Sequence, residues 1–190
     1  MRLVIVYIVL LAGLSFGQSP REMLLSSEGN QNISKLFREV PVLPIDDVDT
    51  ESYRLTIIPT FFSPIVIRVE KHQDKVVLTA KRLSGQGGYD PGTLETELTR
   101  LLHSSAWNRL QDLLSKASFW DLPALQDEFV PNEKNQITVC LDGSSWTLEG
   151  VREGRYHVVS RYCPELRRFE AIGLYLVTLS GLDVKKWELH

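Results

Sequence analysis

Alternating apolar and polar positions run through the middle of the chain. The alternation covers residues 53–57 and 65–69, with a proline-containing break at 59–64, and a short polar link at 72–74 leads into a further segment at 76–83. A period of two is typical of a strand that buries one face. The sequence therefore predicts three antiparallel strands joined as a meander.

Residues 93–102 fit two periods. Leu94, Leu98 and Leu102 stand at helical spacing, and the same leucines also alternate with polar residues as in a strand. Threonines at positions 93, 96 and 99 favour the strand. We predict a strand here, with a helix as the alternative.

Two later segments repeat apolar residues at helical spacing. The first is residues 104–117, where Ser104 or Ser105 is placed to cap the start. The second follows Pro164, and Gly181 stands at its C-terminal cap. Their apolar stripes are Trp107, Leu110, Leu113 and Leu114 in the first, and Leu166, Phe169, Ile172, Leu176 and Leu179 in the second.

Between these helices the period returns to two, at residues 137–141, 146–149 and 156–162. Asp142-Gly143 signals a hairpin, and residues 152–154 suit a three-residue turn. The order is strands, helix, strands, helix. It predicts an α+β fold: an antiparallel sheet built from two strand meanders, with two helices packed on one face.

The N-terminus has the pattern of a secretory signal peptide over residues 1–17. Arg2 precedes an unbroken apolar run from Leu3 to Leu14, and Ser15 and Gly17 are the small residues before a cleavage site. We therefore expect a secreted or periplasmic protein with no transmembrane domain after leader removal. The alternative is an uncleaved N-terminal membrane anchor.

Residues 18–50 lack a clear period and contain Ser, Asn, Gly, Pro and an acidic run at 46–49. This composition predicts a flexible tether, with one helical turn over Ser34–Glu39. Residues 51–190 then form a single α+β domain. That length buries a core without the help of metals or disulfides.

Composition narrows the class of partner. The chain of 190 residues is 43% hydrophobic and 24% charged, as in ordinary globular proteins. Its net charge is −3, which argues against a nucleic-acid binder. The four histidines are dispersed without metal-ligand spacing, so the sequence predicts no metal site and no cofactor.

One polar constellation emerges from the predicted hairpin. With a turn at 152–154, Glu149 lies opposite His157, and Arg161 lies two strand positions further on the same face. A carboxylate beside an imidazole suits acid/base chemistry or ligand binding, so Glu149, His157 and Arg161 are candidate binding residues. The alternative is a solvated cross-strand ion pair. No third residue completes a catalytic triad.

Two cysteines in an oxidising compartment favour a disulfide, here between Cys140 and Cys163. The alternative is a reactive thiolate at Cys163, which precedes a predicted helix N-terminus.

Phe61 and Phe62 stand in a predicted loop, where large apolar residues mark a candidate partner contact. The alternative is a loop that tucks both rings against the core. Gly87-Gly88 superficially resembles a phosphate-binding loop, but it lacks the required glycine spacing, and a hairpin connection is the better interpretation.

Several strings together resemble a group of small bacterial proteins that are predicted to be secreted and carry no assigned function. The resemblance covers about residues 53–181 and implies secretion and a single domain, but no activity, cofactor or catalytic residue. The strings lie at 67–71, 80–89, 119–123, 142–150 and 154–161.

These features favour a non-enzymatic domain that binds a protein or a cell-envelope component. A small-ligand binder or hydrolytic enzyme using Glu149, His157 and Arg161 is one alternative. An enzyme inhibitor that presents the Phe61-Phe62 loop or the Gly87-Gly88 loop is the other.

Overall fold

Six strands form one antiparallel sheet in the computed structural model, which describes residues 18–87, 89–125, 142–164 and 167–189. The strand order is β4-β3-β2-β1-β5-β6. The first four strands are a meander, and the second pair continues the sheet beside β1. The strands are β1 (Thr50–Pro59), β2 (Ile65–His72), β3 (Lys75–Leu83), β4 (Leu94–Leu102), β5 (Ser144–Arg152) and β6 (Arg155–Tyr162).

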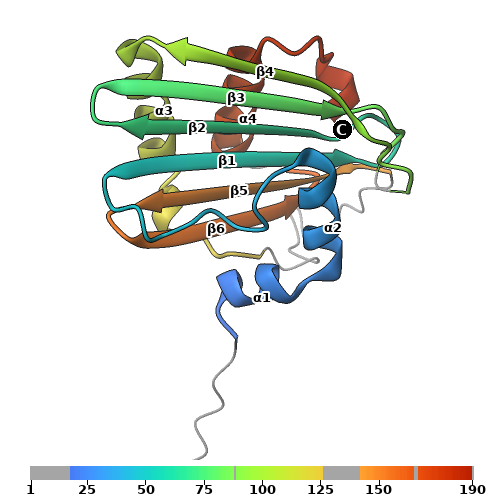
Figure 1. Ribbon diagram of the computed structural model, residues 1–190, viewed down its shortest axis with the longest axis horizontal. Helices are drawn as coiled ribbons and strands as arrows, with labels where there is room; N and C mark the ends of the chain where they lie inside the picture. The colour runs from blue at the N-terminus through green and yellow to red at the C-terminus, as the bar shows by residue number, and fades with distance from the viewer. Residues whose placement is uncertain (1–17, 88, 126–141, 165–166, 190) are drawn as a thin grey trace, which may run out of the picture.

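Two helices cover one face of the sheet, α3 (Ser104–Lys116) and α4 (Arg167–Ser180), as Figure 1 shows. Apolar side chains from alternate strand positions, such as Leu55, Ile67 and Leu148, pack there against both helices. Short 3-10 turns follow α3 at Phe119–Asp121 and α4 at Lys186–Leu189. The predicted α+β class, with two helices on one face, is confirmed. None of the helices in the described ranges is long and apolar enough to cross a membrane.

Residues 94–102 form strand β4, so the strand interpretation is confirmed and the helix is not observed. β4 pairs with β3, which places Leu98 opposite the buried Ala80. The predicted hairpin at Asp142-Gly143 needs a strand at 137–141, and that strand lies outside the described residues. The neighbours of β5 in the sheet are β1 and β6.

The predicted flexible tether is wrong for most of residues 18–50. Ser19 caps helix α1 (Pro20–Ser26) through a reciprocal capping box with Glu22, and helix α2 (Glu28–Phe37) follows. Phe37 and Leu43 are buried, at 1% and 0% exposed. In Figure 1 this N-terminal segment runs along the sheet face opposite α3 and α4. Packing of a few apolar side chains thus orders a segment that its polar composition assigns to a linker.

Candidate functional site

The β5–β6 hairpin has a different turn from the one that the sequence predicts. Its turn consists of two residues, Glu153 and Gly154, both with positive φ (52° and 72°). His157 therefore lies opposite Gly150 instead of Glu149. A shift of one residue moves a side chain to the other face of a sheet. The predicted pairing of Glu149 with His157 is wrong, because the two side chains lie on opposite faces.

His157 belongs to the helix-covered face. Its ring lies 5.1 Å from that of Phe119 and 6.0 Å from that of Trp120, measured between centroids. Its Nε2 is buried and has no hydrogen-bond partner among the described residues. Burial lowers the pKa of the imidazole, and the Arg155 charge adds to the shift. The environment therefore favours a neutral ring packed among aromatics.

Arg161 shares this face with His157, as predicted, but it serves the chain itself. Its Nη2 donates to the carbonyl oxygen of Pro123 at 2.8 Å, and its Nη1 donates to that of Ala124 at 3.3 Å. The guanidinium also lies 5.9 Å from the centroid of the Phe169 ring. Burial lowers its pKa. Arg161 thus fastens the segment after α3 to the sheet.

Glu149 lies on the other face and has three partners of its own. Its carboxylate accepts hydrogen bonds from Arg54 Nε at 2.6 Å and from the Leu43 amide at 3.1 Å. It also accepts one from the Tyr156 hydroxyl at 3.0 Å. Burial, together with the Glu149 charge, raises the pKa of Tyr156 well above its usual range. The predicted trio of Glu149, His157 and Arg161 is therefore split, and each member is engaged by the protein.

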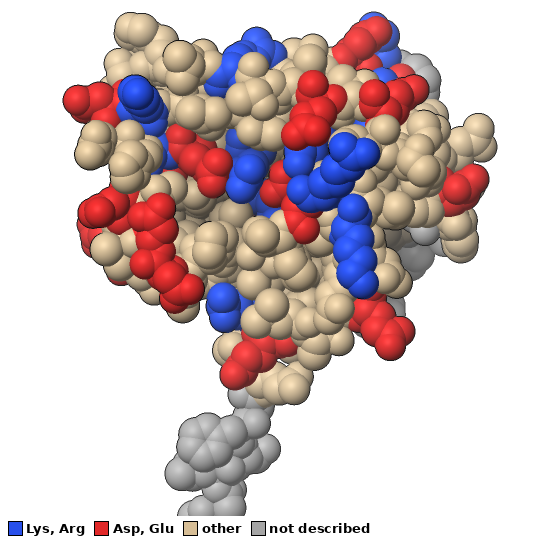
Figure 2. All heavy atoms as spheres, in the orientation of Figure 1, with Lys and Arg blue, Asp and Glu red and all other residues tan. Residues whose placement is uncertain are grey.

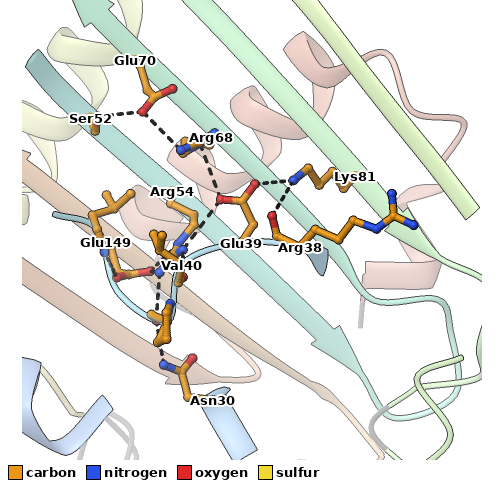
Figure 3. A network of polar contacts seen from close by, with 12 residues as sticks. Asn30, Arg38, Glu39, Val40, Ser52, Arg54, Arg68, Glu70, Lys81 and Glu149 are labelled. Carbon is orange, nitrogen blue, oxygen red and sulfur yellow. Dashed lines mark hydrogen bonds and ion pairs between the residues drawn. The ribbon is translucent and has the colours of Figure 1, made fainter. Parts of the chain in front are cut away.

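Glu149 belongs to a larger network of charged side chains that the sequence did not predict (Figure 3). Its centre is Glu39, whose Oε1 is 2.6 Å from Lys81 Nζ. The other oxygen, Oε2, lies 3.6 Å from Arg68 Nε and 3.9 Å from Arg54 Nη1. The three cations come from three adjacent strands, β3, β2 and β1. Only 3–5% of the side chains of Glu39, Lys81 and Arg54 is exposed.

Each cation of this network has a second carboxylate beside it. The further pairs are Arg54 with Glu149, Arg68 with Glu70 and Lys81 with Glu97. Acidic and basic side chains are also interspersed over the rest of this face (Figure 2). The face is therefore a set of alternating charges and not a uniform basic patch.

Two of these cations, Lys81 and Arg54, also bind the main chain of residues 38–43. This stretch passes from β3 to β5 across the polar face (Figure 3). Two of its residues, Val42 and Leu43, are buried. Lys81 donates to the carbonyl oxygen of Arg38, and Arg54 donates to those of Val40 and Pro41. The polar face is thus covered by a peptide segment whose main chain its side chains bind. The alternation of the strands predicts polar residues there, but it does not predict what covers them.

A hollow of about 340 Å³ opens near His157, at the hairpin end of the sheet. Trp120 lines it together with two arginines. The guanidinium carbons of Arg152 and Arg155 lie 5.0 Å and 5.2 Å from the Trp120 ring centroid. The polar residues Gln111, Ser115, Ser118 and Asp121 also line the hollow.

The loops that the sequence predicts as separate candidate contacts lie together at the other end of the sheet. Gly87, at φ +82°, approaches Thr60 so closely that a Cβ at position 87 would lie 1.8 Å from the Thr60 carbonyl oxygen. The Ser63 hydroxyl donates to the Gly85 carbonyl oxygen at 3.0 Å. Phe61 is 56% exposed on this paired-loop surface, which we define as residues 59–64, 84–87 and 89–92.

Other members of the paired-loop surface behave differently. Phe62 is partly buried, so its ring corresponds to the tucked alternative, whereas Phe61 is the outward one. Tyr89 is 89% exposed and adds a second aromatic side chain. Tyr89 is not among the contacts predicted from the sequence, although its place in a glycine-rich loop was the available signal.

The structure describes one of the two cysteines of the predicted disulfide. Cys163 lies at the end of β6, with φ at +47°, and its amide donates to the Ser144 carbonyl oxygen at 2.9 Å. Cys140 lies outside the described residues.

Comparison with known proteins adds no family to this geometry. The chain matches no protein-family model, and it matches no curated protein sequence.

Proposed function

We propose that this protein is a secreted or periplasmic, non-enzymatic domain that binds a protein partner through the paired-loop surface. The observation that carries the proposal is the exposure of Phe61 and Tyr89, at 56% and 89%, on two loops fixed to each other. Aromatic side chains dominate the binding energy of protein interfaces. A rigid presentation lowers the entropy lost on binding.

Three further observations support a binding role over catalysis. Glu149 is fully engaged by Arg54, Leu43 and Tyr156. His157 is packed among aromatic rings. A hydrolytic role would need a carboxylate and an imidazole within hydrogen-bond reach of one substrate, and these two lie on opposite faces of the sheet.

The proposal is tested by site-specific photo-cross-linking of the full chain in its native envelope. A photoreactive phenylalanine analogue replaces Phe61 or Tyr89, and in a control it replaces Leu101, which is 74% exposed on β4. We expect one discrete adduct from positions 61 and 89 that excess unlabelled protein suppresses, and none from 101. Equal labelling from all three positions would refute the paired-loop surface as the contact.

A second candidate function is the binding of a small anionic ligand in the hollow. Two guanidiniums stack on one indole there, and among the described residues Arg155 donates only to the Trp120 carbonyl oxygen. Arginine forks suit carboxylates and phosphates. Thermal-shift titration with acetate, phosphate and citrate tests this function. We expect stabilisation that disappears in Arg155→Gln and persists in the exposed control Lys75→Gln.

A further inference from the structure

The segment 38–43 binds the sheet much as a separate peptide would. The side chains of Lys81 and Arg54 donate hydrogen bonds to main-chain carbonyl oxygens of the segment, at Arg38, Val40 and Pro41. The Glu149 carboxylate accepts a hydrogen bond from the amide of Leu43. Every residue carries main-chain polar groups, so these contacts do not depend on the side chains of the segment.

Two features of the groove do select for sequence. Three cations converge on the single carboxylate of Glu39, with Lys81 Nζ closest at 2.6 Å. Val42 and Leu43 then fill buried apolar positions, at 6% and 0% exposed. A fitting peptide therefore has an acidic residue followed, three and four positions later, by apolar residues.

The attachment of the N-terminal segment is separate from the main core. Besides Val42 and Leu43, its apolar anchor is a small cluster of Phe37, Val66 and Leu83, distinct from the large cluster under α3 and α4. Residues 46–49, which join the segment to β1, are exposed. Units with few apolar contacts open at lower free energy than the core.

From these observations we propose that Arg54, Arg68, Lys81 and Glu149 form a binding groove for a partner protein's peptide that carries one glutamate before two apolar residues, and that the chain's own residues 38–43 fill this groove in the structure. The chain's own segment 38–43 competes with the partner peptide for the groove. A short link gives it a local concentration in the millimolar range, so a partner peptide binds the intact chain weakly. Opening of the N-terminal segment frees the groove. This site is independent of the paired-loop surface.

The test uses the full chain with a protease site inserted between Asp46 and Asp49 and cleaved under native conditions. The probe is a fluorescent peptide with the sequence of residues 34–45, and the matched peptide carries Gln in place of Glu39. We expect the probe to bind the nicked chain and to displace the native segment. We expect the Gln peptide to bind at least about tenfold more weakly, since a charge-assisted contact is lost.

Two variants make the result specific. Lys81→Gln removes the closest cation and is expected to abolish the preference for Glu over Gln. Lys75→Gln, an exposed change on the same strand, is expected to preserve it. A native segment that never exchanges, a nicked chain that unfolds, or equal binding of both peptides would each overturn the proposal. A dimer of the intact chain that Lys81→Gln abolishes would identify a second copy as the occupant and overturn the choice of a partner peptide.

Discussion

Glu149 lies directly opposite Arg54 in the β1–β5 register, and its carboxylate accepts a hydrogen bond from Arg54 Nε at 2.6 Å. Both side chains are 3% exposed. Removing one partner of a buried ion pair costs about 3–5 kcal/mol, and here it leaves Arg54 with only the more distant Glu39 carboxylate, at 3.9 Å. We therefore expect Glu149→Ala to lower the free energy of unfolding by that amount, measured by urea denaturation.

A surface pair provides the control for this prediction. Asp112 contacts Arg109 and Lys116 on the exposed side of α3, at 2.7 Å and 2.9 Å. Exposed ion pairs contribute little, so Asp112→Ala should leave the urea midpoint nearly unchanged. Equal losses from Glu149→Ala and Asp112→Ala would show that the buried network is not a special source of stability.

The register of β5 and β6 illustrates how far the sequence leads. The alternation in both strands predicts their existence and their apolar faces, and it is confirmed. The pairing depended on the turn length, and Glu153-Gly154 forms a two-residue turn because both residues adopt positive φ. Nothing in the hydrophobic pattern distinguishes two turn residues from three. That single residue decides whether Glu149 and His157 share a face.

The charged face shows a different limit of the sequence. Arg54, Lys81 and Glu149 occupy the polar positions of alternating strands, which predicts exposure to solvent. As whole residues they are only 2%, 4% and 3% exposed, because the N-terminal segment covers them. Hydrophobic periodicity identifies the residues that a strand buries in the core. It does not show that another segment of the chain covers the charged side chains and that its main-chain carbonyl oxygens accept their hydrogen bonds. The capping box of Ser19 and Glu22 was the available sign that this segment is ordered.

His157 should make the stability of the protein depend on pH. Burial places its pKa in the folded state below the ordinary value of 6.5. As pH falls through 6.5, the unfolded chain takes up the proton first, so stability is lost towards acid and is fully present above this range. We expect wild type to lose more stability than His157→Phe between pH 7.5 and about 5, measured by urea denaturation at each pH. Parallel curves for the two proteins would contradict the shift.

Gly87 should be required for the paired-loop surface. Its φ is +82°, and a Cβ at this position would lie 1.8 Å from the Thr60 carbonyl oxygen, which leaves no room for alanine. The conformation alone costs a non-glycine residue roughly 1–2 kcal/mol. We expect Gly87→Ala to lower the melting temperature and to weaken the cross-link from Tyr89.

Gly29 in α2 supplies the matched glycine for this comparison. A Cβ there meets only the Ser27 hydroxyl oxygen, at 3.8 Å. Gly29→Ala should therefore leave the melting temperature unchanged or raise it, because alanine favours helix. A lower melting temperature in Gly29→Ala and an unchanged one in Gly87→Ala would refute the assignment of strain.

The cysteines yield a prediction that depends on the cellular compartment. Cys163 lies beside Ser144, to whose carbonyl oxygen its amide donates, and only three residues separate Cys140 from Ser144 in the sequence. If the chain passes through an oxidising compartment, we expect the two cysteines to form a disulfide. Thiol titration of the denatured, unreduced protein should then find no free thiol, and reduction should release two. Cys163→Ser should lower the free energy of unfolding by about 2–4 kcal/mol, an effect that a reducing agent reproduces in wild type. Two titratable thiols in protein purified from the native compartment would contradict both the bridge and the secretion that it presupposes.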